Sequence, residues 1–144
     1  MKSRVAIVTA ALLASSAAAF AGSRAIELAQ NPASGWQLPA DADQKKNPHQ
    51  VDDALLSTGR AVYKDKCARC HGPGGLGDGA DADPDARKNM DLTNGTRADQ
   101  NADGVVFYKV WNGRRRPRMP AFNKELSEDQ AWAVVAYVQS LRKK

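Results

Sequence analysis

Cysteine and histidine are scarce in this 144-residue sequence, which has two of each. The two cysteines, Cys67 and Cys70, are three positions apart, so a disulfide between them would close a very small loop and could not staple distant segments. A disulfide-built scaffold is therefore excluded. A tetrahedral zinc site would need a second pair of ligands, and a thiol oxidoreductase would need a thioredoxin-like βαβ pattern; neither accompanies this pair.

Long apolar runs are also lacking, apart from Val5–Phe20 near the start. Lys2 and Arg4 precede this run, and the small-x-small sequence ending at Ala21 follows it, which are the three parts of a secretory signal. We expect a signal peptide over residues 1–21 and export to the periplasm. An uncleaved membrane anchor is the alternative, but the run is shorter than the roughly 20 residues that a spanning helix needs.

Two further function classes lack their signatures. The glycine-rich stretch Gly72–Gly79 has no Lys-Ser/Thr pair and follows no predicted strand, so it is not a P-loop. The basic run from Arg114 to Arg118 is short, is interrupted by Pro117 and belongs to an exported chain, which argues against nucleic acid. No nucleic acid partner is expected.

What remains after the leader is enough for one modest domain with an extension. Residues 22–52 are rich in Ala, Pro, Gln, Asn and Asp and carry no period of 2 or 3.6, so we expect an irregular arm or linker. Trp36 is its one expected anchor to the domain, although a disordered arm is equally compatible with the sequence. His49 lies in this arm and is expected on the surface. The folded domain is expected over residues 53–144.

Three stretches carry the three- and four-residue apolar repeat of an amphipathic helix. Gly59 lies inside the first repeat, and we expect it to let the last helix cross closely, because an interior glycine otherwise costs a helix about 1 kcal/mol. The predicted class is all-α, with about three to four helices wrapped around the site described next. The predicted ranges are 53–66 capped by Asp52 or Asp53, 104–112 capped by Asp103, and 131–141 after the capping box Ser127–Gln130.

The two cysteines belong to the pentapeptide Cys67-Ala68-Arg69-Cys70-His71. A CxxCH run is the attachment signal of c-type haem: each thiol forms a thioether with one vinyl group, and the histidine ligates the iron. We therefore expect one haem c, attached through Cys67 and Cys70, with His71 as an axial ligand. The glycine-rich loop that follows is expected to lie against the macrocycle, and the carbonyl of Pro73 to accept a hydrogen bond from the His71 ring.

A second axial ligand is expected from a methionine, because its soft thioether fills the sixth position and raises the reduction potential. Met119 lies between Pro117 and Pro120, which would hold its loop rigidly. Met90 is the competitor, in a loop nearer to His71 in sequence.

These motifs together resemble a single-haem class I cytochrome c over roughly residues 54–142. The resemblance rests on the pentapeptide with Gly72-Pro73-x-Gly75, on Met119-Pro120-Ala121-Phe122, and on a terminal helix ending in Tyr137-Val138-x-x-Leu141. It implies a small all-helical fold wrapped on haem c, with His71 on one side of the iron and Met119 on the other.

The implied function is one-electron transfer between a donor, such as a dehydrogenase or respiratory complex, and an acceptor, such as an oxidase or another cytochrome, without an enzymatic activity of its own. A haem subunit of a specific dehydrogenase complex is the alternative, and a haem enzyme such as a peroxidase is a further one. Residues 72–103 carry seven Asp against three basic residues, whereas residues 104–144 carry nine basic against three acidic residues. Such asymmetry favours oriented docking of a redox partner on a basic surface that includes Arg114, Arg115, Arg116 and Arg118.

Overall fold

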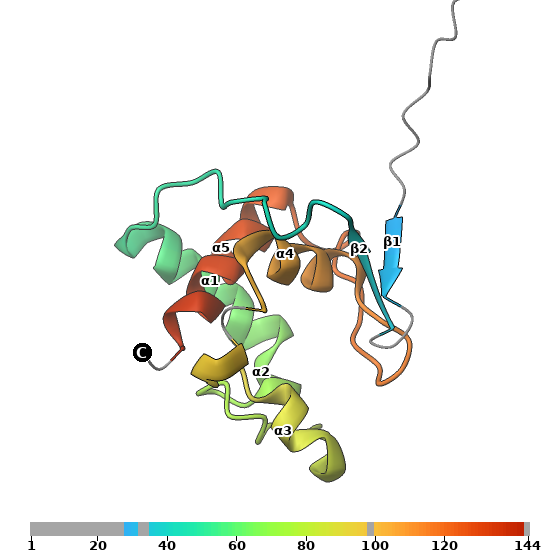
Figure 1. Ribbon diagram of the computed structural model, residues 1–144. Coiled ribbons are helices and arrows are strands. Elements are labelled where there is room, and N and C mark those ends of the chain that lie inside the picture. Colours follow the sequence, from blue (N-terminus) through green and yellow to red (C-terminus); the bar gives the residue numbers. More distant parts are fainter. Residues whose placement is uncertain (1–27, 32–34, 98–99, 143–144) are drawn as a thin grey trace, which may run out of the picture.

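The computed structural model describes residues 28–31, 35–97 and 100–142 (Figure 1). The expected signal peptide, residues 1–21, lies outside the described residues. Within them, no helix is long and apolar enough to cross a membrane. The elements in chain order are β1 (Leu28–Asn31), β2 (Trp36–Pro39), α1 (Asp53–Lys66), α2 (Ala68–His71), η1 (Pro84–Ala86), α3 (Arg87–Met90), η2 (Gly95–Arg97), α4 (Asp103–Asn112) and α5 (Glu128–Ser140).

The all-helical class is confirmed, and the long helices lie where the periodicity predicts them. α1 begins after Asp52, whose carboxylate accepts from the Leu55 backbone N–H at 2.8 Å. α5 begins with the predicted capping box: the Gln130 N–H donates to the Ser127 hydroxyl oxygen, and the Ser127 N–H donates to the Gln130 side-chain oxygen. The caps at the N-termini of α1 and α5 thus pair backbone N–H groups that the first turn of a helix otherwise leaves without an acceptor.

Asp103 does not cap α4, contrary to the expectation. Ala102 is the N-cap residue and makes no side-chain hydrogen bond. The Asp103 carboxylate instead accepts from the Gln139 side chain at 2.8 Å and from the Asn47 backbone N–H at 3.3 Å. The Asp103 carboxylate is therefore bonded to residues of α5 and the arm and not to the first turn of α4.

α1 and α5 cross at Gly59, as the sequence predicts. A Cβ atom on Gly59 would lie 2.1 Å from the Ala133 carbonyl oxygen and 2.9 Å from the Tyr137 Cβ, so only a glycine fits between the two helices. Beside the crossing, the rings of Tyr63 and Tyr137 are tilted against each other with centroids 5.2 Å apart. Figure 1 shows α5 lying across α1.

α4 completes the core through Phe107, whose ring stacks on Trp132 of α5 with centroids 4.2 Å apart. Val106 and Val110 of α4 are buried in the same cluster, so the inner side of this helix packs on protein. Trp111 is only partly buried and stacks on Phe107 with centroids 5.4 Å apart. The core therefore joins α4 and α5 through aromatic contacts and leaves Trp111 at its edge.

The arm is more ordered than the composition indicates. β1 and β2 form an antiparallel hairpin in which Asn31 pairs with Trp36. The chain then runs along α4 and α5: the Lys45 carbonyl accepts from the Gly104 N–H at 2.9 Å, and the Asn47 side chain donates to the Trp132 carbonyl at 3.0 Å. Each strand has only four residues, which is too short for a periodic signal in the sequence. The contacts of the arm with α4 and α5 are with residues distant in sequence.

Candidate haem site

The two cysteines lie where α1 ends and α2 begins. Cys67 is the C-cap residue of α1 and donates its N–H to the Tyr63 carbonyl at 2.9 Å, while Cys70 lies one helical turn further on in α2. Residues three apart in a helical turn lie on the same side, so the two thiols face one region. Both are free and partly buried. Two thioethers of one haem require this arrangement.

Burial raises the pKa of the Cys67 thiol to about 12. A redox-active cysteine needs the opposite shift, because the thiolate is the nucleophile in thiol–disulfide exchange. The environment of Cys67 thus argues against a thiol oxidoreductase.

His71 ends α2, and its ring is fixed by one hydrogen bond: Nδ1 lies 2.8 Å from the carbonyl oxygen of Met90. A carbonyl can only accept, so Nδ1 carries the proton and Nε2 carries the lone pair. Burial lowers the pKa of His71, while the Met90 carbonyl opposes this shift. The ring is therefore a neutral imidazole whose Nε2 can bind a metal.

The expected partner, the Pro73 carbonyl, is thus replaced by the carbonyl of Met90, nineteen residues downstream of His71. Gly77 brings that carbonyl close. Its φ is +74°, and a Cβ atom there would lie 2.6 Å from the Arg87 carbonyl oxygen and 3.2 Å from the Met90 carbonyl carbon. No sequence pattern could have marked Met90, because a backbone carbonyl is the same in every residue.

The glycine-rich loop is expected to lie against the macrocycle. Two of its glycines also make hydrogen bonds within the protein. Besides the approach at Gly77, the Gly77 N–H donates to the His71 carbonyl at 2.8 Å. The Gly72 carbonyl accepts from the buried Tyr63 hydroxyl at 2.7 Å. These bonds tie the residues after the pentapeptide to α1 and to His71 itself.

Met119 lies in the loop between α4 and α5, where two backbone hydrogen bonds of 2.9 Å join it to Arg114 in a short antiparallel bridge. The Arg114 side chain closes the loop, since its Nε donates to the Pro117 carbonyl at 2.9 Å. At the other end, the Phe122 N–H donates to the Val110 carbonyl at 3.1 Å. The side chain of Met119 is partly buried and packs against the core.

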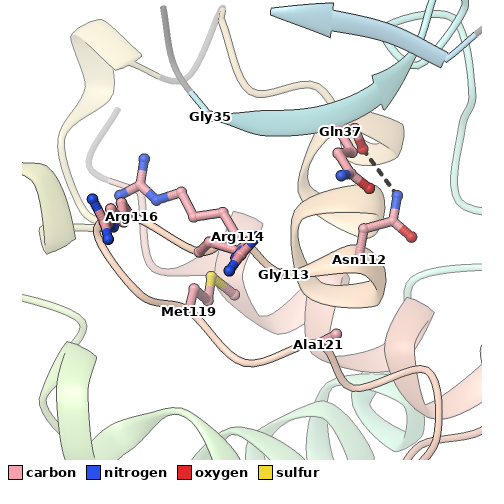
Figure 2. A pocket seen from close by; sticks show the side chains of 9 residues that line it. Gly35, Gln37, Asn112, Gly113, Arg114, Arg116, Met119 and Ala121 are labelled. Atoms are coloured by element: carbon pink, nitrogen blue, oxygen red, sulfur yellow. Dashed lines mark hydrogen bonds between the residues drawn. The ribbon is translucent and has the colours of Figure 1, made fainter. Parts of the chain in front are cut away.

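A cavity of about 580 Å³ lies between this loop and the arm (Figure 2). Met119 and Arg114 line it from the loop, and Gly35 and Gln37 line it from the arm. Figure 2 shows a hydrogen bond between two of its lining residues, from the Asn112 side chain to the Gln37 carbonyl at 2.9 Å. The arm is thus part of the surroundings of Met119, which the sequence did not indicate.

Positive charge gathers beside this region. Burial, followed by the charges of Arg114, Arg97 and Arg142, lowers the pKa of Lys109 to about 8. Lys109 donates to the Asn101 side chain, and Arg142 donates to the Asn101 carbonyl at 2.8 Å. Cations crowded in this way favour an anionic group among them, and the propionate carboxylates of haem are such groups.

His49 is the other histidine, and it lies only partly at the surface, since its side chain is 35% exposed. Its Nε2 lies 3.1 Å from the Asp129 carboxylate at the start of α5, where the Asp129 side chain is 83% exposed. The His49 ring nitrogen thus faces the Asp129 carboxylate, and this contact explains its position without a role at the haem site.

The residues therefore fit haem c by their chemistry: two thiols on one side of a helical turn, a neutral imidazole with its Nε2 lone pair available, a thioether on a fixed loop, and a cluster of cations. Residues 54–138, more than half of the chain, match the protein family described as Cytochrome C oxidase, cbb3-type, subunit III. The chain belongs to this family. It is a class I c-type cytochrome.

Two solved structures resemble this cytochrome. A chain of the reducing HAO-like protein complex of Kuenenia stuttgartiensis is 33% identical, with a TM-score of 0.58, over 67% of this chain and 47% of its own length. Cytochrome CL of the marine bacterium Methylophaga aminisulfidivorans is 20% identical, with a TM-score of 0.50, over 72% of this chain and 60% of its own length, a likeness of fold. This chain thus covers less than two thirds of either relative.

Membership confirms the resemblance drawn from the motifs. Haem c is the cofactor of this family, and membership in the family supports electron transfer.

Proposed function

We propose that the protein is an exported one-electron carrier with a single haem c, attached through Cys67 and Cys70 and ligated by His71 and Met119. When bound, the haem supplies an iron that cycles between Fe(II) and Fe(III). The observation that carries the proposal is the hydrogen bond from His71 Nδ1 to the Met90 carbonyl, which leaves Nε2 as the ligating atom. Such partners orient a metal-bound histidine and raise its basicity.

The same hydrogen bond favours Met119 over Met90 as the second ligand. The Met90 carbonyl occupies Nδ1, whereas Nε2 is the atom that would hold the iron, so Met90 is engaged at the ring nitrogen that would not bind the metal. Met119 comes from a separate loop that is held at both ends. A fully ligated iron would suit electron transfer and would leave no position for a substrate.

The basic docking surface is proposed on Arg115, Arg116 and Arg118, which are exposed on the loop that carries Met119. Arg114 belongs to the same run in sequence, but its side chain is turned to Trp36 and the Pro117 carbonyl. The donor would be a dehydrogenase or respiratory complex, and the acceptor an oxidase or another cytochrome, each with an acidic face. Positive charge near the exposed haem edge would steer such partners.

Export to the periplasm is proposed from the leader in residues 1–21. Mass spectrometry of the purified protein tests it: cleavage after Ala21 supports export with a removed signal, and a mature N-terminus at Met1 would contradict it.

A second candidate is a haem subunit of a larger redox complex. It is favoured by the chain of the Kuenenia stuttgartiensis protein complex, which is 33% identical. Purification from native membranes and soluble extract, followed by native mass measurement, separates the two: a free carrier elutes alone, and a subunit copurifies with a fixed partner.

The experiment that tests the carrier assignment uses the purified holoprotein. A haem signal should stay with the polypeptide on a denaturing gel, and the reduced native protein should bind CO weakly because both axial positions are filled. Tight CO binding by the native protein would point to a peroxidase or gas sensor instead. The basic surface is tested with ferricyanide, an anionic oxidant. The rate of its reaction with the reduced protein should fall as ionic strength rises, and this fall should be smaller in the variant Arg115→Gln/Arg118→Gln.

A further inference from the structure

We propose that Trp36, in the N-terminal arm, is a positioning residue for the loop that supplies Met119, and that it acts by stacking on Arg114. The inference rests on the proposed ligation by Met119 and adds the arm to the machinery that keeps this ligand in place. A segment that the composition marks as a linker would then tune the haem site.

Arg114 is the residue through which the arm reaches the ligand. Its guanidinium carbon lies 4.3 Å from the centre of the Trp36 ring, a cation–π distance. The Arg114 side chain donates to the Pro117 carbonyl at 2.9 Å. The Arg114 backbone exchanges two hydrogen bonds of 2.9 Å with the backbone of Met119. Arg114 therefore contacts the indole of Trp36, the Pro117 carbonyl within the loop and the backbone of Met119, the proposed ligand.

Trp36 is itself held, so it can act as a support. It begins β2, and the next residue, Gln37, accepts from the Asn112 side chain at 2.9 Å, which ties the strand to the end of α4. The Lys109 ammonium lies 5.2 Å from the centre of the indole, so two cations contact one ring. The ring is half-buried, and β2 runs beside the loop in Figure 2.

The physical reason for such a support is the weakness of the thioether as a ligand. A methionine on a loop that opens easily would be displaced by competing ligands, so any contact made only in the closed loop lowers the open fraction. A cation–π contact of this kind is worth a factor of about 2 to 30 in an equilibrium constant. We therefore expect that loss of the indole raises the fraction of loop-open protein by about that factor.

Imidazole titration of the ferric holoprotein measures this fraction, because imidazole binds where Met119 has left. Trp36→Leu should raise the apparent affinity for imidazole by about 2- to 30-fold, and Trp36→Phe should restore most of the native value because it keeps a ring under Arg114. Arg114→Gln should raise the affinity as well. In the double variant Trp36→Leu/Arg114→Gln, the combined effect should be smaller than the sum of the two single effects, because both substitutions remove the shared Trp36–Arg114 contact and Arg114→Gln alone also removes the bond to the Pro117 carbonyl.

Asn47→Ala is the matched control. It removes a different contact of the arm, the hydrogen bond to the Trp132 carbonyl at 3.0 Å, far along the chain from the Met119 loop. It should lower the free energy of unfolding and leave the imidazole affinity unchanged. If Trp36→Leu behaves like Asn47→Ala, the indole only stabilises the fold and the proposal is overturned.

Met119→Ala separates this outcome from failure of the proposed ligation. It should bind imidazole more tightly than every arm variant, since no thioether competes. If Met119→Ala and the native protein bind imidazole equally, Met119 is not the ligand, and the inference falls with the proposed function. If Met119→Ala binds more tightly while Trp36→Leu does not, the ligation stands and the role of the arm is wrong.

Discussion

The Nδ1 of His71 lies 2.8 Å from the carbonyl oxygen of Met90, in a segment nineteen residues away. This single contact determines which ring nitrogen carries a proton and leaves the Nε2 lone pair available for the proposed iron. It depends on the turn at Gly77, where the chain passes close to the backbone of residues 87–91. The hydrogen bond of the proposed ligand His71 thus involves a segment that packs closely on Gly77.

Gly77→Ala should disturb this contact. The new Cβ would meet the Arg87 carbonyl at 2.6 Å and lie on a residue with a φ of +74°, so the segment carrying the Met90 carbonyl has to shift. A weaker hydrogen bond makes the imidazole less basic, which favours Fe(II) and raises the reduction potential. A change of about 1 kcal/mol corresponds to roughly 40 mV for one electron. Spectroelectrochemical titration measures it.

Gly74→Ala is the control for that measurement, because its Cβ would meet no atom within 4 Å. Its potential should equal that of the native protein. A Gly77→Ala protein with the native potential would show that the Met90 carbonyl does not influence the iron.

Tyr63→Phe removes the buried hydroxyl that donates to the Gly72 carbonyl at 2.7 Å, immediately after His71. The unpaired carbonyl should lower the free energy of unfolding by about 1–3 kcal/mol. Burial also raises the pKa of Tyr63, so this tyrosine should not ionise in the pH range where an exposed tyrosine does. Chemical denaturation of the holoprotein tests the first effect, and an ultraviolet pH titration the second. Tyr108→Phe removes a hydroxyl that accepts an exposed hydrogen bond of 3.5 Å from Lys45, so it should be nearly neutral.

Gly59→Ala should destabilise the protein even though alanine is the better helix former. Helix propensity alone predicts a gain of about 1 kcal/mol. The new methyl group would lie 2.1 Å from the Ala133 carbonyl oxygen, so α1 and α5 would have to separate. We expect a loss of about 2 kcal/mol or more in thermal or denaturant unfolding, as for other overpacked sites. Ser57→Ala, on the exposed side of α1, is the control, and a stabilised Gly59→Ala would refute the close crossing.

In the haem-free protein, where no propionate lies among these cations, stability should rise with pH between about 8 and 10.5 through Lys109. Burial lowers the pKa of this lysine from its usual 10.5 to about 8, so in that range the unfolded chain binds more protons than the folded one. The penalty is fully present below pH 8 and is relieved as the pH rises to 10.5. The contribution is on the order of 1–3 kcal/mol. The difference in unfolding free energy between the native protein and Lys109→Gln, followed against pH, isolates it; a flat difference would contradict the shift.

The sequence predicted the parts of this protein that are encoded locally. Periodicity and caps located α1 and α5, Gly59 predicted their crossing, and the pentapeptide with its flanking motifs predicted the family, which the comparison confirmed. The prediction that Asp103 caps α4 is wrong because its partners, Gln139 and Asn47, are distant in sequence.

Two features of the site had no local signal. The Met90 carbonyl is a backbone group and leaves no trace in residue type, so the sequence indicates the Pro73 carbonyl, which is near His71 in the chain, instead. The stacking of Trp36 on Arg114 joins residues that are far apart in the chain. Trp36 could be predicted as an anchor from its size in a polar arm, but not the residue that it contacts.

The account depends most on His71 and Met119 as the axial pair. The ferric absorption spectrum of the native holoprotein, Met119→Ala and Met90→Leu tests it, together with their reduction potentials. The charge-transfer band between sulfur and iron should be present in the native protein and in Met90→Leu, and it should be lost in Met119→Ala, where the potential falls. A band that survives in Met119→Ala, or disappears in Met90→Leu, would contradict the account.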